Sequence, residues 1–429
     1  MRGREVKGTL NLFQAQMLRW RELHPYNAVH AVALGRNRDP GAVQAAIRQE
    51  LEHCGLTGLV LDRRRRRFQY GGGPAHVELP VLRGPAWMPL LEREIERQLN
   101  APFDDASPRQ PFRFFLVDAD DERLLGLAYD HFIAGGDCIL MLLHAIATRA
   151  SGGTPSYRPD LYPPTQARLF LRNLPRLARG IARLPALVRG ARHTARPRYR
   201  DATDGYNGYA LYRLDAGRMR RLTGAAKAWG VTVNDLFLAL LLAAADRLAP
   251  NRRTAPLRRE LAVASIMNLR GELGTAAASA FGQYLGSLRV AHAVPEGVTL
   301  ETLARDVHAE TAAVKEGKLF LQTLLAMRYV AAVWRWLTPA QRAGFYNKSY
   351  PIWAGLSTLN VNAMWTRAPG TPAPLYIRGV PTGPLAPLVL ATTTVADVLY
   401  AGISYRTAAL DRAAVDGFWG ALTARLDTL

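Results

Sequence analysis

One histidine of this chain stands where a general base could act. His131 follows the apolar stretch Leu124–Tyr129 and precedes two glycines, Gly135 and Gly136, and a second apolar stretch that begins at Cys138. This order predicts a strand, a short loop and a helix, with the imidazole on the loop. An imidazole with a near-neutral pKa can take a proton from an alcohol or an amine. A lone histidine at a strand end is more often structural, so its interpretation depends on the rest of the chain.

Other catalytic patterns do not occur in the sequence. The nine histidines have no metal-ligand spacing such as HExxH, and there is no CxxC pair, Walker A loop or GxSxG motif. Gly71–Gly73 lacks the lysine and helix start of a phosphate-binding loop and is interpreted as a turn. Cys138 falls in the first turn of an apolar helix, which fits a small buried residue better than a nucleophile. The sequence therefore predicts no metal and no tightly bound cofactor.

Length and composition indicate a folded protein of two parts. A chain of 429 residues is longer than one hydrophobic core usually accommodates, which predicts two domains of about 200 residues each. The residues are 49% hydrophobic and 21% charged, a composition that builds a core. No apolar region follows the basic N-terminus, and the longest apolar run, Leu236–Ala245, is too short to span a bilayer. With only Cys54 and Cys138 there is no disulfide framework, so we expect a cytoplasmic protein.

The net charge of +20 predicts an anionic partner, and one segment carries much of it. From Arg168 to Arg200 there are ten arginines and no acidic residue. Arginines and apolar residues repeat there every three or four positions with an offset of two, which places them on opposite faces of a helix. Pro175 and Pro185 would kink or divide this helix. The repeating residues are Arg168, Arg172, Arg176, Arg179 and Arg183 on one face, and Phe170, Leu174, Leu177, Ile181, Leu184 and Val188 on the other.

Two interpretations of this basic segment stay open. A basic amphipathic helix is typical of proteins held at an anionic membrane surface, which would place the protein at the inner face of the membrane. Alternatively, the segment is a linker that packs its apolar side on the protein's own core. Nucleic acid is a weaker candidate partner, because no nucleic-acid-binding motif occurs and the run Arg63–Arg67 is interpreted as the rim of a hairpin.

The first half of the chain is predicted to be mixed α/β. Tyr26–Leu34 alternates like a strand, and Pro40–Cys54 has helical spacing. Pro111–Val117 is a further strand that can pair with Leu124–Tyr129 across the polar turn 118–123. Paired strands with helices between them suggest a sheet that is covered on one face.

The second half continues with the same mixture of elements. A long apolar helix begins within Val231–Leu241, where Asn234 or Asp235 is positioned to cap it. The other expected elements are strands at 209–214, 261–266 and 356–363, a segment at 281–288, two terminal strands, and helices at 215–229 and 413–426.

Five short segments match, in order along the chain, the motifs of one protein superfamily. They are Leu99–Asp104 with Pro111–Arg113 (PFD…PLR), Asp130–Gly136 (HHxxxDG), Thr232–Asp235 (xxND), Ser265–Arg270 (NLR) and Phe281–Gly286, a glycine-containing strand segment. In these the chain resembles the acyltransferases that include chloramphenicol acetyltransferase, the condensation domains of nonribosomal peptide synthetases, and the bacterial wax ester synthase and diacylglycerol acyltransferase family. Each match is weak alone, but together they cover nearly the whole chain.

The resemblance implies an α/β fold of two similar chloramphenicol-acetyltransferase-like subdomains. Each would be a mixed sheet with helices, and the two would form a V-shaped pair with a tunnel between them. The expected division is an N-terminal subdomain at 1–160 with the histidine motif, a basic amphipathic linker at 161–204 and a C-terminal subdomain at 205–429.

The histidine motif departs from the pattern of the superfamily. Its first histidine is replaced by Asp130 and its aspartate by Gly135, with Asp137 two positions later. The second histidine is the catalytic one in the superfamily, which gives that role to His131. The aspartate there pairs with an arginine to hold the loop, and we expect Asp137 to do so with Arg270. Asp130 either orients the imidazole or replaces a dispensable histidine; the second is favoured, because adjacent strand residues point to opposite faces.

The resemblance also implies the reaction. An acyl group would pass from a coenzyme A or carrier-protein thioester to a hydroxyl or amine, in lipid or secondary-metabolite biosynthesis, with His131 as base. Backbone amides at Gly135 and Gly136 are the candidate donors to the oxyanion. Weaker candidates for the oxyanion or the tunnel are Ser265, Ser357, Thr358 and Asn360.

The candidate partners follow from the same chemistry. The acyl-CoA or phosphopantetheine-linked acyl group is a substrate, and an acidic acyl carrier protein would fit the basic charge. The DFGWG latch of peptide synthetases is not recognisable, and Asn360–Trp365 near its place is closer to the wax ester synthase pattern. The altered motif leaves an alternative, a non-catalytic relative that binds carrier protein or a membrane surface.

Overall fold

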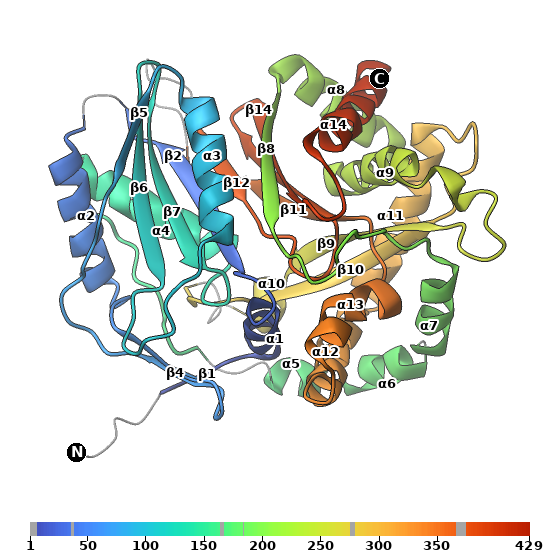
Figure 1. Ribbon diagram of the computed structural model, residues 1–429, viewed down its shortest axis with the longest axis horizontal. Helices are drawn as coiled ribbons and strands as arrows, with labels where there is room; N and C mark the ends of the chain where they lie inside the picture. The colour runs from blue at the N-terminus through green and yellow to red at the C-terminus, as the bar shows by residue number, and fades with distance from the viewer. Residues whose placement is uncertain (1–6, 36–37, 164–166, 183, 275–278, 366–374) are drawn as a thin grey trace.

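The protein consists of two α/β halves that lie side by side (Figure 1). The computed structural model describes residues 7–35, 38–163, 167–182, 184–274, 279–365 and 375–429. Each half has its own mixed sheet with helices packed on it. The predicted fold class is therefore confirmed.

The first half is built around a five-stranded sheet in the order β12-β2-β7-β6-β5. The three strands expected here are present, and β6 and β7 form the predicted antiparallel pair. Two further strands, β5 and β12, were not expected. The strands are β2 (Asn27–Ala33), β5 (Val81–Gly84), β6 (Phe112–Ala119), β7 (Arg123–Asp130) and β12 (Tyr376–Gly379).

Helices cover both faces of this sheet, so the expectation of one covered face was wrong. Val32 and Leu125 lie in the core on the face of α2 and α4, and Val29 and Leu124 lie in the core on the face of α3. Successive strand residues point to opposite faces, and here they are apolar on both, so each face needs a cover. The helices are α2 (Pro40–His53), α3 (Trp87–Asn100) and α4 (Gly136–Ala150).

The second half is built around a six-stranded sheet in the order β10-β9-β11-β13-β14-β8. β11 runs parallel to both of its neighbours, and the other pairs are antiparallel. The strands expected in this half are present, although the one expected within 281–288 begins at Leu285. They are β8 (Asn207–Leu214), β9 (Leu261–Asn268), β10 (Leu285–His292), β11 (Ala354–Asn360), β13 (Leu388–Val395) and β14 (Val398–Arg406).

Helix α9 is the buried core helix of the second half and contacts α11 and α14. It begins at Val233, so its N-cap is Thr232 and not Asn234 or Asp235 as expected. Asp235 instead completes a capping box, because its carboxylate accepts from the Thr232 N–H. The helices of this half are α8 (Ala216–Trp229), α9 (Val233–Ala245), α10 (Arg270–Leu273), α11 (Leu300–Glu316), α12 (Phe320–Trp334), α13 (Pro339–Ser349) and α14 (Arg412–Asp427).

No single helix in the described part of the chain is long and apolar enough to cross a membrane. One pair of helices, Ala216–Trp229 and Val233–Leu248, meets the criteria together by length and composition alone, with a bend of 105° between them.

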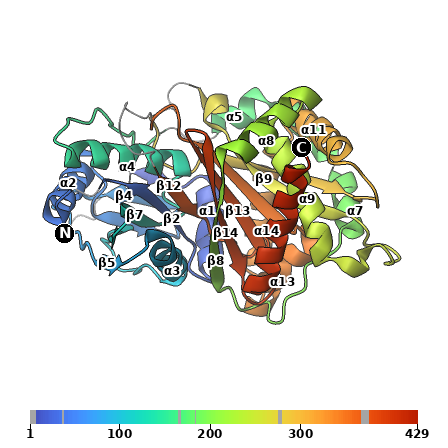
Figure 2. The same ribbon diagram turned by 90° about the horizontal axis from the view of Figure 1, so that it is seen from above.

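Two segments tie the halves together. β12 comes from the second half of the chain but pairs with β2 at the edge of the first sheet (Figure 2). Helix α1 (Leu12–Arg21) packs on α12, and Gln16 Nε2 and Trp20 Nε1 each donate to the Tyr346 hydroxyl at 2.9 Å. The first sheet is built from strands before residue 161, except for β12, and the second sheet from strands after residue 204. A small third sheet holds β1 (Gly8–Thr9), β3 (Leu59–Asp62) and β4 (Arg67–Tyr70), with the run of arginines at the β3–β4 turn.

The basic linker forms three short helices instead of one. Pro175 and Pro185 each occupy the second position of a helix, so the prolines divide the segment as predicted. Parts of the expected pattern lie outside the described residues, namely Arg183 and the side chains of Arg168, Arg179, Leu184 and Val188. The helices are α5 (Ala167–Arg172), α6 (Leu174–Ala182) and α7 (Leu184–His193).

The apolar face expected for the linker packs on the core only in part. Leu177 is buried as expected, together with Leu169, which was not assigned to that face. Leu174 and Ile181 are instead 57% and 54% exposed. The division at Pro175 changes the direction of the chain, so residues predicted for one continuous stripe take different environments.

Candidate active site

His131 lies directly after β7, as predicted, and aromatic rings enclose its side chain. Its backbone N–H donates to the Tyr26 carbonyl at 3.0 Å, which extends the pairing of β7 with β2 by one residue. The imidazole centroid lies 5.6 Å from the ring of Tyr26 and 5.5 Å from the ring of Tyr129. Only 7% of the His131 surface is exposed. The tunnel to this residue stays a prediction.

Burial keeps the His131 imidazole neutral. Burial, and after it the Arg378 guanidinium, lower the pKa of His131 to about 3. A neutral imidazole can accept a proton, so His131 is in the protonation state that a general base requires. Its Nδ1 lies 3.3 Å from Gln283 Nε2. Among the described residues no hydrogen bond reaches its Nε2, so this ring nitrogen is open to a substrate, and it can accept a proton only in the tautomer that carries its hydrogen on Nδ1.

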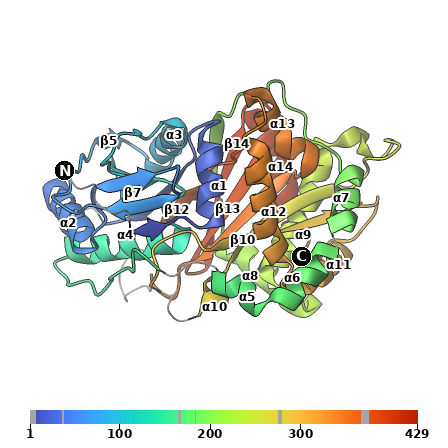
Figure 3. The same cartoon turned by 90° about the horizontal axis from the view of Figure 1, so that it is seen from below.

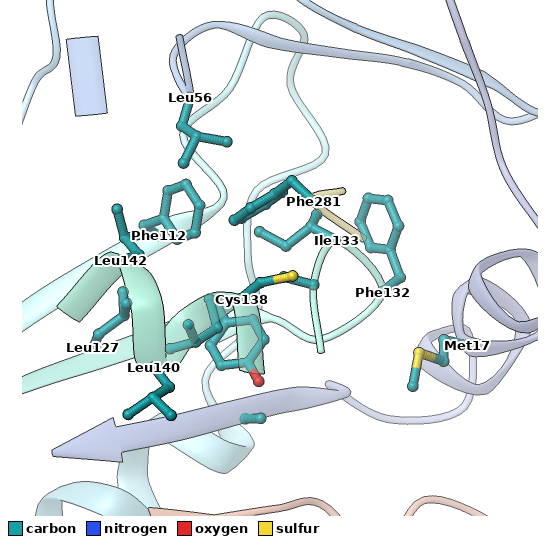
Figure 4. Close-up of a cluster of buried hydrophobic side chains, with 14 of the residues drawn as sticks. Met17, Leu56, Phe112, Leu127, Phe132, Ile133, Cys138, Leu140, Leu142 and Phe281 are labelled. Carbon is teal, nitrogen blue, oxygen red and sulfur yellow. The ribbon is translucent and has the colours of Figure 1, made fainter. Parts of the chain in front are cut away.

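The loop after His131 is held by residues of the second half. Gln283 Nε2 donates to the carbonyls of His131, at 2.5 Å, and Ala134, and the Gly135 N–H donates to the Gly282 carbonyl at 3.1 Å. Phe281 packs in the same hydrophobic cluster as Phe132 and Ile133 of the loop (Figure 4). The catalytic candidate therefore depends on contacts between the halves.

The predicted pair of Asp137 and Arg270 is present. The Arg270 guanidinium donates to the Asp137 carboxylate, and Asn268 Nδ2 contacts the same oxygen at 3.3 Å. Arg270 also donates to the Ala280 carbonyl at 2.6 Å and lies over the ring of Tyr284. The shifted aspartate thus connects the start of α4 to the segment before β10.

Asp130 belongs to a different network. Its carboxylate is fully buried and lies 2.9 Å from Arg109 Nη2 and 3.4 Å from Arg21 Nε. Both arginines also contact Asp105, whose side chain is 63% exposed. In the described part of the structure no hydrogen bond joins Asp130 to the imidazole of His131. The favoured interpretation, that Asp130 does not orient the base, agrees with this geometry.

Most of the predicted oxyanion donors already take part in a hydrogen bond within the described part of the protein, but the Gly136 amide does not. The Gly135 amide is occupied by Gly282, whereas the Gly136 amide makes no hydrogen bond within the described residues. Ser265 donates to Asn234 at 3.2 Å, and the Ser357 hydroxyl accepts from Arg378 Nη1 at 3.1 Å. Of the predicted donors, the Gly136 amide is the one that is placed beside the loop and open.

The remaining predicted residues lie away from the imidazole. Thr358 and Asn360 are exposed on β11, and Asn360 Oδ1 accepts from the Asn362 N–H at 3.0 Å. Asp235 is buried at the start of α9, where its carboxylate binds Thr311 at 2.7 Å and His308 at 2.8 Å. Its contacts are those of a helix start and not of the His131 loop.

Cys138 is buried, as predicted, and is no candidate nucleophile. Its side chain is 3% exposed, and Arg270 Nη2 lies 2.9 Å from its sulfur. Burial raises the pKa of the Cys138 thiol to about 12, so the thiolate is scarce at neutral pH.

The sequence patterns did not indicate Arg378, which is a buried cation beside the candidate site. Arg378 lies on β12 and reaches across to the second sheet, where it donates to the Ser357 carbonyl and the Thr392 carbonyl, each at 2.7 Å. Its Nη1 lies 3.6 Å from the place where a Cβ on Gly136 would stand. No carboxylate of the described residues forms an ion pair with it. Its short strand gave no periodic signal, so only the topology places it here.

Two neighbours of Arg378 were also missed. His30 on β2 has Nδ1 2.7 Å from the Tyr376 hydroxyl, and its Cε1 lies 3.4 Å from the same Cβ position on Gly136. Burial lowers the pKa of His30 well below its usual value, so this imidazole is neutral too. The Cβ position of Gly136 is therefore in contact with one cation and one neutral imidazole.

Comparisons with known proteins identify the fold. No family model and no curated protein matches the sequence. The first condensation domain of the calcium-dependent antibiotic synthetase, in complex with a substrate analogue, matches with a TM-score of 0.69 and 14% identity over 99% of this chain and 96% of that one. A starter condensation domain of rhizomide synthetase, in complex with C8-CoA, matches with a TM-score of 0.66 and 15% identity over 99% and 95%. The X-domain from teicoplanin biosynthesis matches with a TM-score of 0.57 and 20% identity over 100% and 96%.

The chain therefore has the fold of condensation domains over nearly its whole length. This confirms the fold that the sequence motifs implied.

Proposed function

We propose that this protein is an acyltransferase in which His131 is the general base. The observation that carries the proposal is a neutral imidazole on the loop between β7 and α4, with Nε2 unoccupied among the described residues, in a chain with the condensation-domain fold. Buried, neutral bases on loops that a rigid scaffold holds are typical of catalytic sites. The inward-facing contacts of Gln283 and Arg270 supply that rigidity here.

The proposed reaction has two steps. In the tautomer with its hydrogen on Nδ1, His131 Nε2 takes the proton of an acceptor hydroxyl or amine while the acceptor oxygen or nitrogen bonds to the thioester carbonyl carbon. The carbon–sulfur bond of the resulting tetrahedral species then breaks, and the thiolate leaves with the proton from His131. The products are an ester or amide and a free thiol, so no external oxidant or metal enters the balance.

Arg378 and the Gly136 amide are the proposed donors to the oxyanion. Arg378 Nη1 lies 3.6 Å from the place of a Cβ on Gly136, and each such donor typically contributes about a few kcal/mol to the transition state. The positive charge of Arg378 lowers the proton affinity of His131 in the free protein. A developing oxyanion offsets that charge, so His131 becomes a stronger base as the tetrahedral species forms.

The proposed donor is an acyl thioester of coenzyme A or of an acyl carrier protein. Support comes from the net charge of +20, which favours a phosphate-bearing or acidic donor, and from the fold shared with a starter condensation domain solved with C8-CoA. Lipid and secondary-metabolite biosynthesis are the settings in which such products are made.

The test is release of free thiol from a panel of acyl thioesters. The purified protein is expected to release coenzyme A or holo-carrier protein only when a hydroxyl or amine acceptor is present. If no donor and acceptor combination releases thiol above the uncatalysed rate, while the protein still binds carrier protein, the enzyme proposal is wrong and the binding alternative stands.

A protein-binding role is the second candidate. It is favoured by the low exposure of His131 and by the likeness, at a TM-score of 0.55 and 19% identity, to an X-domain solved in a complex with OxyB. In that case His131 would be a packing residue, and its replacement would change stability but not any transfer rate.

The pH profile gives an independent prediction. Because the pKa of His131 is lowered to about 3, the neutral base persists on the acidic side of neutrality, and kcat/KM should stay level from about pH 8 to about pH 5. Arg378→Met removes one cause of the lowered pKa, so the acidic limb of the kcat/KM profile should shift to higher pH. Arg378→Lys keeps the charge and should leave the limb where it is. A limb near the ordinary histidine pKa in the unmodified protein would contradict the prediction.

A further inference from the structure

One side of the molecule is formed by the linker helices α5 and α6 together with α12 (Figure 3). α6 contacts α12 so closely that a Cβ on Gly180 would stand 2.6 Å from Gln322 Nε2. Leu169, Asn173 and Leu177 of the linker are buried. Other residues of these helices are exposed, among them Leu171, Leu174 and Tyr329, and we call the outer surface of α5, α6 and α12 the helical face.

The helical face carries the most exposed large apolar side chains of the described residues. Nine such side chains are exposed, and the five with the highest exposure all lie on these helices or directly after α12. Scattered single apolar residues are normal on a protein surface, but a group of this kind marks an interaction site. The five are Leu171 (65%), Leu174 (57%), Ile181 (54%), Tyr329 (68%) and Trp336 (76%).

The same face is positive. Residues 161–200 and 317–396 contain no aspartate or glutamate, and the first of these segments holds ten arginines. Arg172, Arg176, Arg328 and Arg335 are exposed, and none of them takes part in an ion pair among the described residues. The Arg335 guanidinium lies 5.0 Å from the ring of Trp336. Apolar and basic side chains therefore occur together on three helices that contain no acidic residue.

We propose that the helical face is a docking surface for an anionic lipid bilayer. Leucine and isoleucine side chains would enter the acyl boundary, Tyr329 and Trp336 would lie at the headgroup level, and the arginines would bind lipid phosphates. The apolar side chains stand exposed on the outer sides of helices, so a deformable layer fits them better than a rigid partner protein. This inference goes beyond acyl transfer and does not depend on it.

The buried linker residues decide how the face must be tested. Removing the whole linker would also remove Leu169 and Leu177 from the core, so loss of binding after deletion would report unfolding. Single substitutions at exposed positions avoid this. Leu174→Ser, Tyr329→Ser and Trp336→Ser change the face, while Tyr206→Ser changes a tyrosine that is 40% exposed and outside the face.

The experiment is flotation of the full chain with lipid vesicles. The unmodified protein should float with vesicles of phosphatidylcholine and phosphatidylglycerol but not with phosphatidylcholine alone, and added salt should weaken binding. Each of the three substitutions on the face should weaken binding about tenfold, and Tyr206→Ser should leave it unchanged. Equal binding to neutral vesicles, or full binding by the face variants, would overturn the proposal. The proposal would also be overturned if these substitutions abolished binding of an acidic carrier protein but left binding to vesicles unchanged.

Discussion

His131→Ala is expected to lower kcat for acyl transfer by about two to four orders of magnitude, the usual contribution of a positioned general base. The base acts only while the acceptor proton is transferred, so kcat should fall with little change in KM. The ring contacts Tyr26 and Tyr129 but carries no described ion pair, so the protein should remain folded. The measurement is thiol release from an acyl thioester at saturating acceptor, with thermal unfolding followed on the same samples.

His24→Ala is the matched control for this experiment. His24 is a half-buried histidine whose Nε2 lies 2.8 Å from the Asn100 side chain, and no described hydrogen bond or ring contact joins it to the His131 loop. We expect its replacement to leave kcat near that of the unmodified protein. If His24→Ala and His131→Ala transfer acyl groups equally well, the imidazole of His131 is not the base.

The strand, loop and helix around His131 could be predicted because the signal is local. A short continuous apolar run defines β7, two glycines define the loop, and a longer apolar run defines α4. The pairing of Asp137 with Arg270 came from the order of motifs along the chain, since the resemblance supplied a partner that spacing alone could not. The same local reasoning could have found α3, where Leu91, Ile95 and Leu99 repeat every four residues and are all fully buried.

The positions of Arg378 and Gln283 at the site could not be predicted, for a physical reason. Arg378 reaches the site because the chain returns from the second sheet to add β12 to the first. Gln283 reaches it because the segment before β10 crosses to the motif loop. Both placements depend on how two sheets are joined, and a period of two or of 3.6 residues carries no information about that. Sequence patterns thus predicted the position of His131 but not its electrostatic surroundings.

Asp130→Ala is expected to lower the free energy of unfolding by about 3 kcal/mol or more, because removing one partner of a buried ion pair leaves a buried charge uncompensated. The carboxylate of Asp130 is fully buried between Arg109 and Arg21, whose side chains are 5% and 9% exposed. After the substitution both guanidinium groups depend on Asp105, which is mostly in solvent. Urea unfolding followed by circular dichroism measures the change.

Two further variants separate stability from catalysis at this position. Asp105→Ala removes a carboxylate that binds the same two arginines but is 63% exposed, so it should cost less than about 1 kcal/mol. Asp130→Asn keeps the shape and a hydrogen-bond acceptor, so it should cost less than Asp130→Ala and leave kcat of the folded protein unchanged. A normal stability for Asp130→Asn together with a large loss of kcat would mean that Asp130 orients the imidazole after all. The buried arginines argue against that outcome, because they bind the carboxylate of Asp130, and no described hydrogen bond joins it to the imidazole of His131.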